Sequence, residues 1–132
     1  MTALYENRDF AASVSEKLKI YAQPQRLMIL SCLLRGERNV AEIGEVTGIG
    51  QPALSQQLAE LRRADLVSTR KEAKLVYYSL ANEGVGLCVR SMEAIFGGSD
   101  VLEAAPSKII EQSRKPSTKP IPSGAAGFAQ IL

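Results

Sequence analysis

The chain has 132 residues, with 16 Lys and Arg, 14 Asp and Glu and no histidine, so its formal net charge is +2. No run approaches the roughly 18 apolar residues of a membrane span and no secretory signal is recognisable, so we expect a soluble, cytoplasmic protein without a membrane partner. Two cysteines without histidine argue against a transition-metal site, and no paired acid and base or nucleophile points to an enzyme or a cofactor.

Two helices are predicted at the start of the chain. Apolar residues at Phe10, Val14, Leu18 and Tyr21 follow a helical period. Pro24 breaks this helix and begins the next, about residues 25–34, which is apolar nearly all round and therefore central to the core. Gly36 is the expected stop of the second helix.

Residues 39–63 predict a helix-turn-helix. Asn39 with Glu42 nearly matches a capping box, and the short helix that follows carries an apolar stripe of Val40, Ile43 and Val46. A turn at 48–50 leads to a helix of about 51–63 whose buried stripe is Leu54, Leu58 and Leu61. Its opposite face begins uncharged and ends basic, with Pro52, Ser55, Gln56, Ala59 and Arg63. A helix that reads base edges with its first residues and holds phosphate further along needs this layout.

From Leu66 the apolar period changes from 3.6 to 2, which predicts a β-hairpin made of residues 66–70 and 75–80. Its charged tip, residues 71–74, has no glycine, so we expect a loop longer than two residues. Asn82 is expected to cap a last helix that ends at residues 97–98.

Residues 99–132 are predicted to be a Pro-rich, flexible C-terminal tail, separate from a single domain of residues 1–98. The tail carries four prolines and four basic residues, which are Pro106, Pro116, Pro120 and Pro122, with Lys108, Arg114, Lys115 and Lys119. These basic residues are candidates for an additional, nonspecific phosphate contact.

The order helix, helix, helix-turn-helix, hairpin, helix is that of a winged helix-turn-helix, a mainly α fold with a β-hairpin (α+β). Over about residues 10–97 the chain resembles the ArsR/SmtB family of bacterial repressors, on the strength of Gln25-Arg26-Leu27 after Pro24 and of the segments 50–58, 71–73 and 76–80. It looks closest to members without a metal site, the nodulation-repressor (NolR-like), haemolysin-regulator (HlyU-like) and biofilm-growth-repressor (BigR-like) types. The resemblance implies a homodimeric transcriptional repressor that binds a palindromic promoter operator in double-stranded DNA. It does not identify an inducer.

Candidate DNA contacts come from the second helix of the helix-turn-helix and from the hairpin. Gln51, Ser55 and Gln56 suit base readout, because glutamine can bond adenine N6 and N7 and serine can donate or accept. The resemblance places these positions, with Pro52, in the major groove. The candidate phosphate contacts are Arg62, Arg63, Arg70, Lys71 and Lys74. Gln51 could instead serve only to start the helix, and each cation could be ordinary surface charge.

The apolar residues of the first and last helices exceed what one small winged helix buries, so we expect a twofold dimer. The alternative is that they form only the core of one subunit. The candidate interface residues are Phe10, Val14, Leu18, Tyr21, Val85, Met92, Ile95 and Phe96. The dimer of the resembled family, built from its first and last helices, agrees with this expectation.

Cys32 and Cys88 are candidates for a thiol (sulfide or redox) switch. Sulfide- and persulfide-responsive relatives carry thiols at positions where this chain has Ser31 and Gly97, so the resemblance does not carry over directly. Buried free cysteines acting as small hydrophobes are the alternative. The family's metal sites also lack their ligands here, since residues 40–43 contain no cysteine.

A second class of function stays open, a protein-interaction module that keeps the fold but has lost DNA binding. In that case the tail would be the functional segment. Replacement of Gln56 and Arg63 by alanine separates the two, because only a DNA-binding protein would lose duplex binding.

Overall fold

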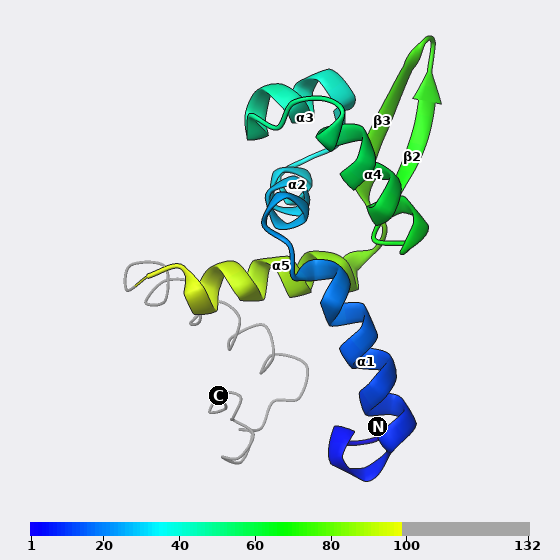
Figure 1. The fold of residues 1–132 in the computed structure, drawn as a ribbon, viewed down its shortest axis with the longest axis vertical. Coiled ribbons are helices and arrows are strands. Elements are labelled where there is room, and N and C mark those ends of the chain that lie inside the picture. Colours follow the sequence, from blue (N-terminus) through cyan, green and yellow to red (C-terminus); the bar gives the residue numbers. More distant parts are fainter. Residues whose placement is uncertain (99–132) are drawn as a thin grey trace, which may run out of the picture. The chain divides into compact units, whose positions relative to one another are not determined.

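The computed structural model describes residues 1–98, which form five α-helices, one short 3-10 helix and a three-stranded antiparallel sheet (Figure 1). In chain order the elements are η1 (Leu4–Glu6), α1 (Arg8–Tyr21), α2 (Pro24–Leu34), β1 (Arg38–Asn39), α3 (Val40–Thr47), α4 (Ala53–Arg63), β2 (Val67–Glu72), β3 (Leu75–Leu80) and α5 (Glu83–Phe96). Contacts divide the chain within α5, between Arg90 and Ser91. The domain boundary at residue 98 stays a prediction, and the tail 99–132 lies outside the described residues.

The predicted helix ends are confirmed where a side chain caps the backbone locally. Asn39 Oδ1 accepts from the Glu42 amide at 2.9 Å, and Glu42 Oε1 accepts from the Asn39 amide at 3.0 Å, which completes a capping box at the start of α3. Gly48 ends α3 with a φ of 76°, a left-handed conformation that glycine adopts without a steric penalty. Asn82 Oδ1 accepts from the Val85 amide at 3.0 Å at the start of α5.

The leucine stripe of α4 is buried as predicted. Leu54, Leu58 and Leu61 are each at most 2% exposed, and α4 packs on α2, whose Ile29 and Leu30 are completely buried. This packing fixes which side of α4 faces the solvent.

The predicted apolar stripe of α3 is wrong at Val46, which is 59% exposed. Ile43 is completely buried, and a Cβ placed on Gly44 would lie 3.2 Å from the Leu54 side chain. The close approach of α4 therefore turns Ile43 and Gly44 toward the core and leaves Val46 on the surface.

The hairpin tip corrects the predicted long loop. Strands β2 and β3 pair as far as Glu72 opposite Leu75, so the turn contains only Ala73 and Lys74. Ala73 adopts a φ of 57°, which costs about 1 kcal/mol in a non-glycine residue. The continuous cross-strand pairing offsets this cost.

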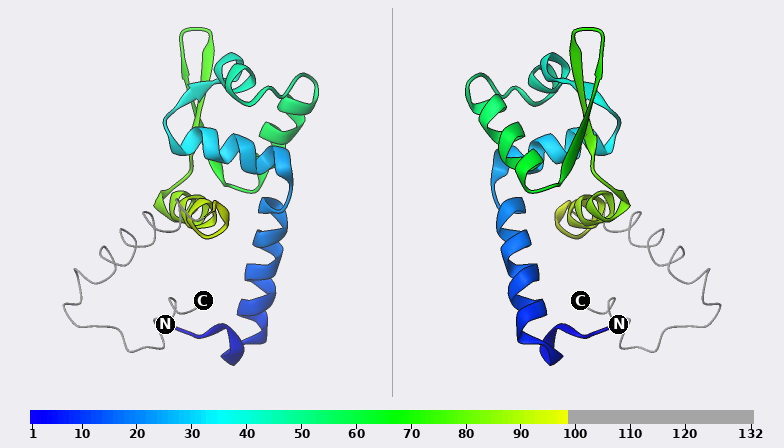
Figure 2. Two further views of the ribbon diagram at one scale, coloured as in Figure 1. Left: turned by 90° about the vertical axis from the view of Figure 1, so that its left-hand side faces the viewer. Right: turned by 90° about the vertical axis from the view of Figure 1, so that its right-hand side faces the viewer.

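Strand β1 was not predicted, because a two-residue strand has no periodicity to detect. It pairs antiparallel with β3, with Arg38 opposite Tyr78, so the sheet order is β1-β3-β2. Figure 2 shows the β2–β3 hairpin, here called the wing, extending beyond α2, α3 and α4.

Replacement of Leu61 by alanine should lower the free energy of unfolding by about 3 kcal/mol, because Leu61 is completely buried and its removal leaves a cavity. The control is Val46→Ala, whose exposed side chain should contribute less than about 0.5 kcal/mol. Urea unfolding at one fixed protein concentration measures both. Equal losses for the two variants would contradict the packing of α4.

Candidate nucleic-acid interface

The first turn of α4 joins two predicted base-reading residues. Gln51 Oε1 accepts from both the Ser55 amide, at 3.1 Å, and the Ser55 hydroxyl, at 2.7 Å. The helix itself begins at Ala53, and Pro52 occupies the N-cap position without a side-chain cap, so Gln51 takes over the capping role. Within residues 1–98 the Gln51 amide NH2 has no hydrogen-bond partner. Gln51 therefore starts the helix and still offers two donors to a ligand.

The exposed side of α4 matches the prediction. Gln51, Pro52, Ser55, Gln56 and Ala59 are exposed, as are Arg62 and Arg63 near the end of the helix. Arg63 Nη2 lies 2.6 Å from Glu60 Oε2, and both side chains are largely exposed. A solvent-exposed pair of this kind contributes at most about 1 kcal/mol, so an incoming phosphate can replace the carboxylate. The structure thus places uncharged polar groups at the start of α4 and guanidinium groups at its end.

Arg62 differs from Arg63 in its contacts. Its guanidinium makes no ion pair within the part of the chain that the structure describes. Lys71 and Lys74, on the wing, are exposed and likewise unpaired among residues 1–98. These three cations remain available to a polyanion.

Arg70 was predicted as a phosphate contact, and the structure gives it other partners. Its Nε and Nη2 donate to the two carboxylate oxygens of Glu37 at 2.8 Å each, and its Nη1 donates to Glu72 at 2.6 Å. The guanidinium also lies over the Tyr77 ring, 4.7 Å from its centroid. Arg70 therefore links the wing to Glu37, the residue that precedes β1, and its contact with phosphate stays a prediction.

The contacts of Arg70 change the proton affinity of Glu37. Hydrogen bonds from Arg70 lower the pKa of the Glu37 carboxyl below its ordinary value, and the two carboxylates raise the pKa of Arg70 further. Sequence reasoning missed this pair because 33 residues separate its members. No local pattern signals such a contact.

The predicted interface residues fall into two groups. Tyr21 and Val85 are 7% and 6% exposed, so a single subunit already buries them. On α1, Phe10 and Leu18 are 40% and 55% exposed and Val14 is half-buried. On α5, Ile95 and Phe96 are 58% and 81% exposed and Met92 is half-buried. Only the exposed and half-buried residues of α1 and α5 can contact another molecule without a change in the structure of the subunit.

The two cysteines are free thiols in different environments. Cys32 is buried in α2, and Cys88 is exposed on α5. Burial raises the pKa of Tyr21 to about 12, and the neighbouring Cys88 thiol adds to the rise. A thiol switch stays a prediction, for which the structure leaves only Cys88 accessible to a reagent.

No helix of residues 1–98 is both long and apolar enough to cross a membrane. In the same residues no three side chains of the metal-ligating types gather where they could hold an ion.

Comparisons with known proteins agree on one family. Residues 23–69 match the family described as "Bacterial regulatory protein, arsR family". The biofilm growth-associated repressor of Agrobacterium fabrum is 43% identical over 86 residues, which are 65% of this chain and 74% of that protein. The crystal structure of the transcriptional repressor BigR from Xylella fastidiosa matches with a TM-score of 0.68 and 35% identity, over 74% of this chain and all of that one. A homodimeric winged helix-turn-helix DNA-binding domain from Mycobacterium bovis matches with a TM-score of 0.61 and 28% identity, over 74% and 88%.

The Glu37 carboxyl should titrate below 4.5 in the wild type, and Arg70→Ala should move its pKa up toward that value. Because the folded-state pKa is the lower one, the pair stabilises the protein above about pH 4.5 and this stabilisation is lost as the pH falls through the folded-state pKa. Carboxyl-carbon NMR measures the titration. Lys71→Ala is the control and should leave Glu37 unchanged. An identical Glu37 midpoint in wild type and Arg70→Ala would exclude the contact.

Proposed function

The chain belongs to the arsR family of bacterial regulatory proteins, and from this premise we propose that it represses transcription by occupying a palindromic promoter operator as a homodimer. The protein is a DNA-binding transcription regulator of the winged helix-turn-helix type. Two relatives named as repressors support repression, while HlyU of Vibrio cholerae, named a transcriptional activator, is also similar to this chain. Because a bacterial regulator works on the chromosome, we place it in the cytoplasm.

The observation that carries the proposal is the exposed polar start of α4. Helix packing turns Gln51, Ser55 and Gln56 outward together, and the Gln56 side chain makes no hydrogen bond within residues 1–98. Glutamine amides suit adenine, and the exposed Pro52 ring suits a thymine methyl group. We assign base readout to these four residues.

Phosphate contacts follow from the free cations. Arg62, Lys71 and Lys74 are exposed and unpaired among the described residues, and the Arg63 ion pair is open to solvent. A helix in the major groove with the wing beside it brings both groups of cations to the backbone of one duplex. We assign phosphate binding to these four residues, and Arg70 to the support of the wing.

Dimerisation is proposed for the exposed apolar residues of α1 and α5. One recognition helix makes few base contacts, and two of them spaced by about one turn, roughly 34 Å, read a palindrome. The Mycobacterium bovis domain named as homodimeric supports this assembly. The proposed interface residues are Phe10, Val14, Leu18, Met92, Ile95 and Phe96.

Duplex binding tests the proposal against a module that has lost DNA contact. Wild-type protein should bind the promoter fragment beside its own gene with a log–log salt slope of about −5 to −7, as expected for a dimer that neutralises about six to eight phosphates. Fluorescence anisotropy measures the affinity, and footprinting locates the site. A slope near zero would contradict the proposal.

Replacement of Gln56 and Arg63 by alanine should weaken this binding at least about tenfold, because a base contact and a phosphate contact are lost in each subunit. Lys19→Ala is the matched loss of one charge. Lys19 is exposed on the side of α1 opposite Phe10 and Val14, so this variant should bind as the wild type does. Equal affinities for all three proteins would favour the interaction module. A chain that ends before Pro106 then tests, by the same affinity measurement, whether the tail contributes to duplex binding.

The dimer interface is tested by Leu18→Glu. Leu18 is 55% exposed within the subunit, so the change should leave the fold intact while it places a charge in the proposed interface. Sedimentation equilibrium should show monomers, and operator affinity should fall by about two orders of magnitude or more. Val46→Glu, with similar exposure on α3, should remain dimeric. A dimeric Leu18→Glu protein would move the interface elsewhere.

A further inference from the structure

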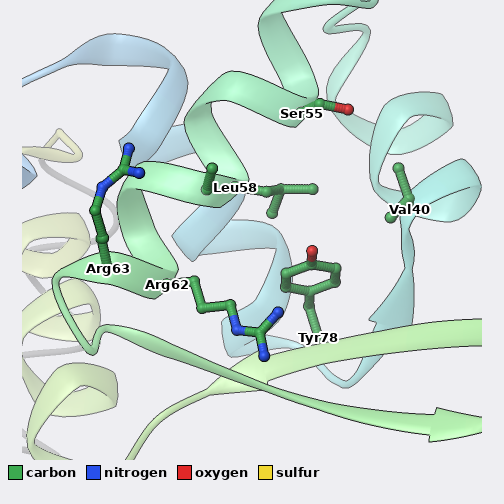
Figure 3. Close-up of a pocket in the computed structure, with 7 residues that line it drawn as sticks. Val40, Ser55, Leu58, Arg62, Arg63 and Tyr78 are labelled. Atoms are coloured by element: carbon green, nitrogen blue, oxygen red, sulfur yellow. The ribbon is translucent and has the colours of Figure 1, made fainter.

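A groove of about 500 Å³ separates α4 from the sheet, and three of its lining residues, Ser55, Arg62 and Arg63, are candidate DNA contacts. Leu58 lies at its bottom, Ser55, Arg62 and Arg63 line the α4 side, and Tyr78 of β3 and Val40 of α3 line the other. Figure 3 shows the Tyr78 hydroxyl pointing from β3 into the space between α4 and Val40. The groove contains no acidic lining residue.

Two hydrogen-bond donors face this groove without a partner in the described part of the chain. The Ser55 hydroxyl proton is already given to Gln51, so Ser55 can only accept. The Arg62 guanidinium and the hydroxyl of the half-buried Tyr78 have no hydrogen-bond partner within residues 1–98. Among the described residues the Tyr78 hydroxyl is not one of the buried side-chain atoms without a partner, so water or a ligand can reach it. Arg62 and Tyr78 are therefore two unused donors directed at one space.

The neighbouring strand adds positive charge on the same side of the sheet. Arg38 lies directly opposite Tyr78 in the β1–β3 register, and directly opposed residues project from the same face. The Arg38 Nε atom is buried and has no partner among the described residues. Arg38 does not line the groove itself, and it adds a positive charge beside Tyr78 on that face of the sheet.

The position of the groove identifies its ligand. A helix in the major groove and a wing beside it straddle the sugar–phosphate strand that separates the two grooves of DNA. In the proposed complex, that strand runs past the space between α4 and β3. Guanidinium and tyrosine hydroxyl groups are regular donors to phosphate oxygens.

We propose that this groove binds a backbone phosphodiester of the operator, with Arg62 and Tyr78 donating to its oxygens. The proposal rests on the proposed function and adds to it a contact residue, Tyr78, that carries no charge. One phosphate is held in each subunit, between the bases read by α4 and the backbone reached by Lys71 and Lys74.

The test compares Tyr78→Phe with Tyr77→Phe. Both remove one hydroxyl and keep the ring, and Tyr77, the adjacent residue of β3, projects from the opposite face of the sheet under Arg70. The probe is a labelled duplex of about 30 base pairs, long enough for two half-sites, recovered with wild-type protein from a random-sequence library. A scrambled duplex of equal length is measured beside it.

Tyr78→Phe should weaken binding about tenfold on both duplexes, because a phosphate contact carries no sequence information, and should leave the salt slope unchanged. Arg62→Ala should weaken binding and reduce the slope by about 2 per dimer. The double variant should lose less than the product of the two single losses, because both side chains hold the same phosphate. Tyr77→Phe should bind as the wild type does.

Three results would overturn the inference. The first is Tyr78→Phe affinity within about twofold of the wild type on both duplexes. The second is a loss on the selected duplex alone, which would make Tyr78 a base contact. The third is saturable binding of inorganic phosphate at the groove, seen by NMR at constant ionic strength, with DNA binding insensitive to Tyr78→Phe. A wild-type protein that enriches no duplex from the library would instead overturn the proposed function.

Discussion

Burial of the three leucines of α4 is the constraint on which the rest of the structure depends. Leu54, Leu58 and Leu61 together contribute about 5 to 9 kcal/mol of transfer free energy, more than any exposed contact of the helix. A roll of α4 by one residue, about 100°, would expose them, so the helix has a single orientation. Gln51, Ser55, Gln56 and Arg62 face outward as a direct consequence. The polar side of the helix is thus positioned by interactions in which it takes no part.

The charges of the wing divide into those used by the subunit and those left for a ligand. Arg70 donates hydrogen bonds to Glu37 and Glu72. The bonds to Glu37 link the wing to the segment before β1. Lys71 and Lys74, next along the chain, have no such partners within residues 1–98. A net charge of +2 therefore understates the attraction of this surface for DNA, because neutralised and unpaired cations count equally in the sum. The local pairing decides which cations can release counterions from phosphate.

Features encoded by neighbouring residues could be predicted from the sequence, and features that need distant residues could not. The capping box of Asn39 and Glu42 and the stripe of α4 are local, and both were predicted correctly. Val46 fits the same helical period as Ile43, but its exposure depends on Gly44 meeting Leu54 across the turn. The pairing of β1 with β3, the Arg70–Glu37 contact and the groove beneath Tyr78 each join segments more than thirty residues apart or on different elements. The two-residue turn at Ala73 was missed because pairing along the strands overrides the preference for glycine.

In the proposed dimer, the residues that contact DNA are separate from the residues that set the spacing of the two α4 helices. A recognition helix of 11 residues contacts few base pairs, and its rigid packing against α2 leaves it little freedom to adapt. In the proposed dimer, discrimination therefore depends on the distance between two rigid helices, which must match one turn of the duplex. That distance is set by the surfaces of α1 and α5 and not by the residues that touch DNA. A change at the dimer contacts would alter operator affinity through both half-sites at once, whereas a change at Gln56 alters one base contact in each.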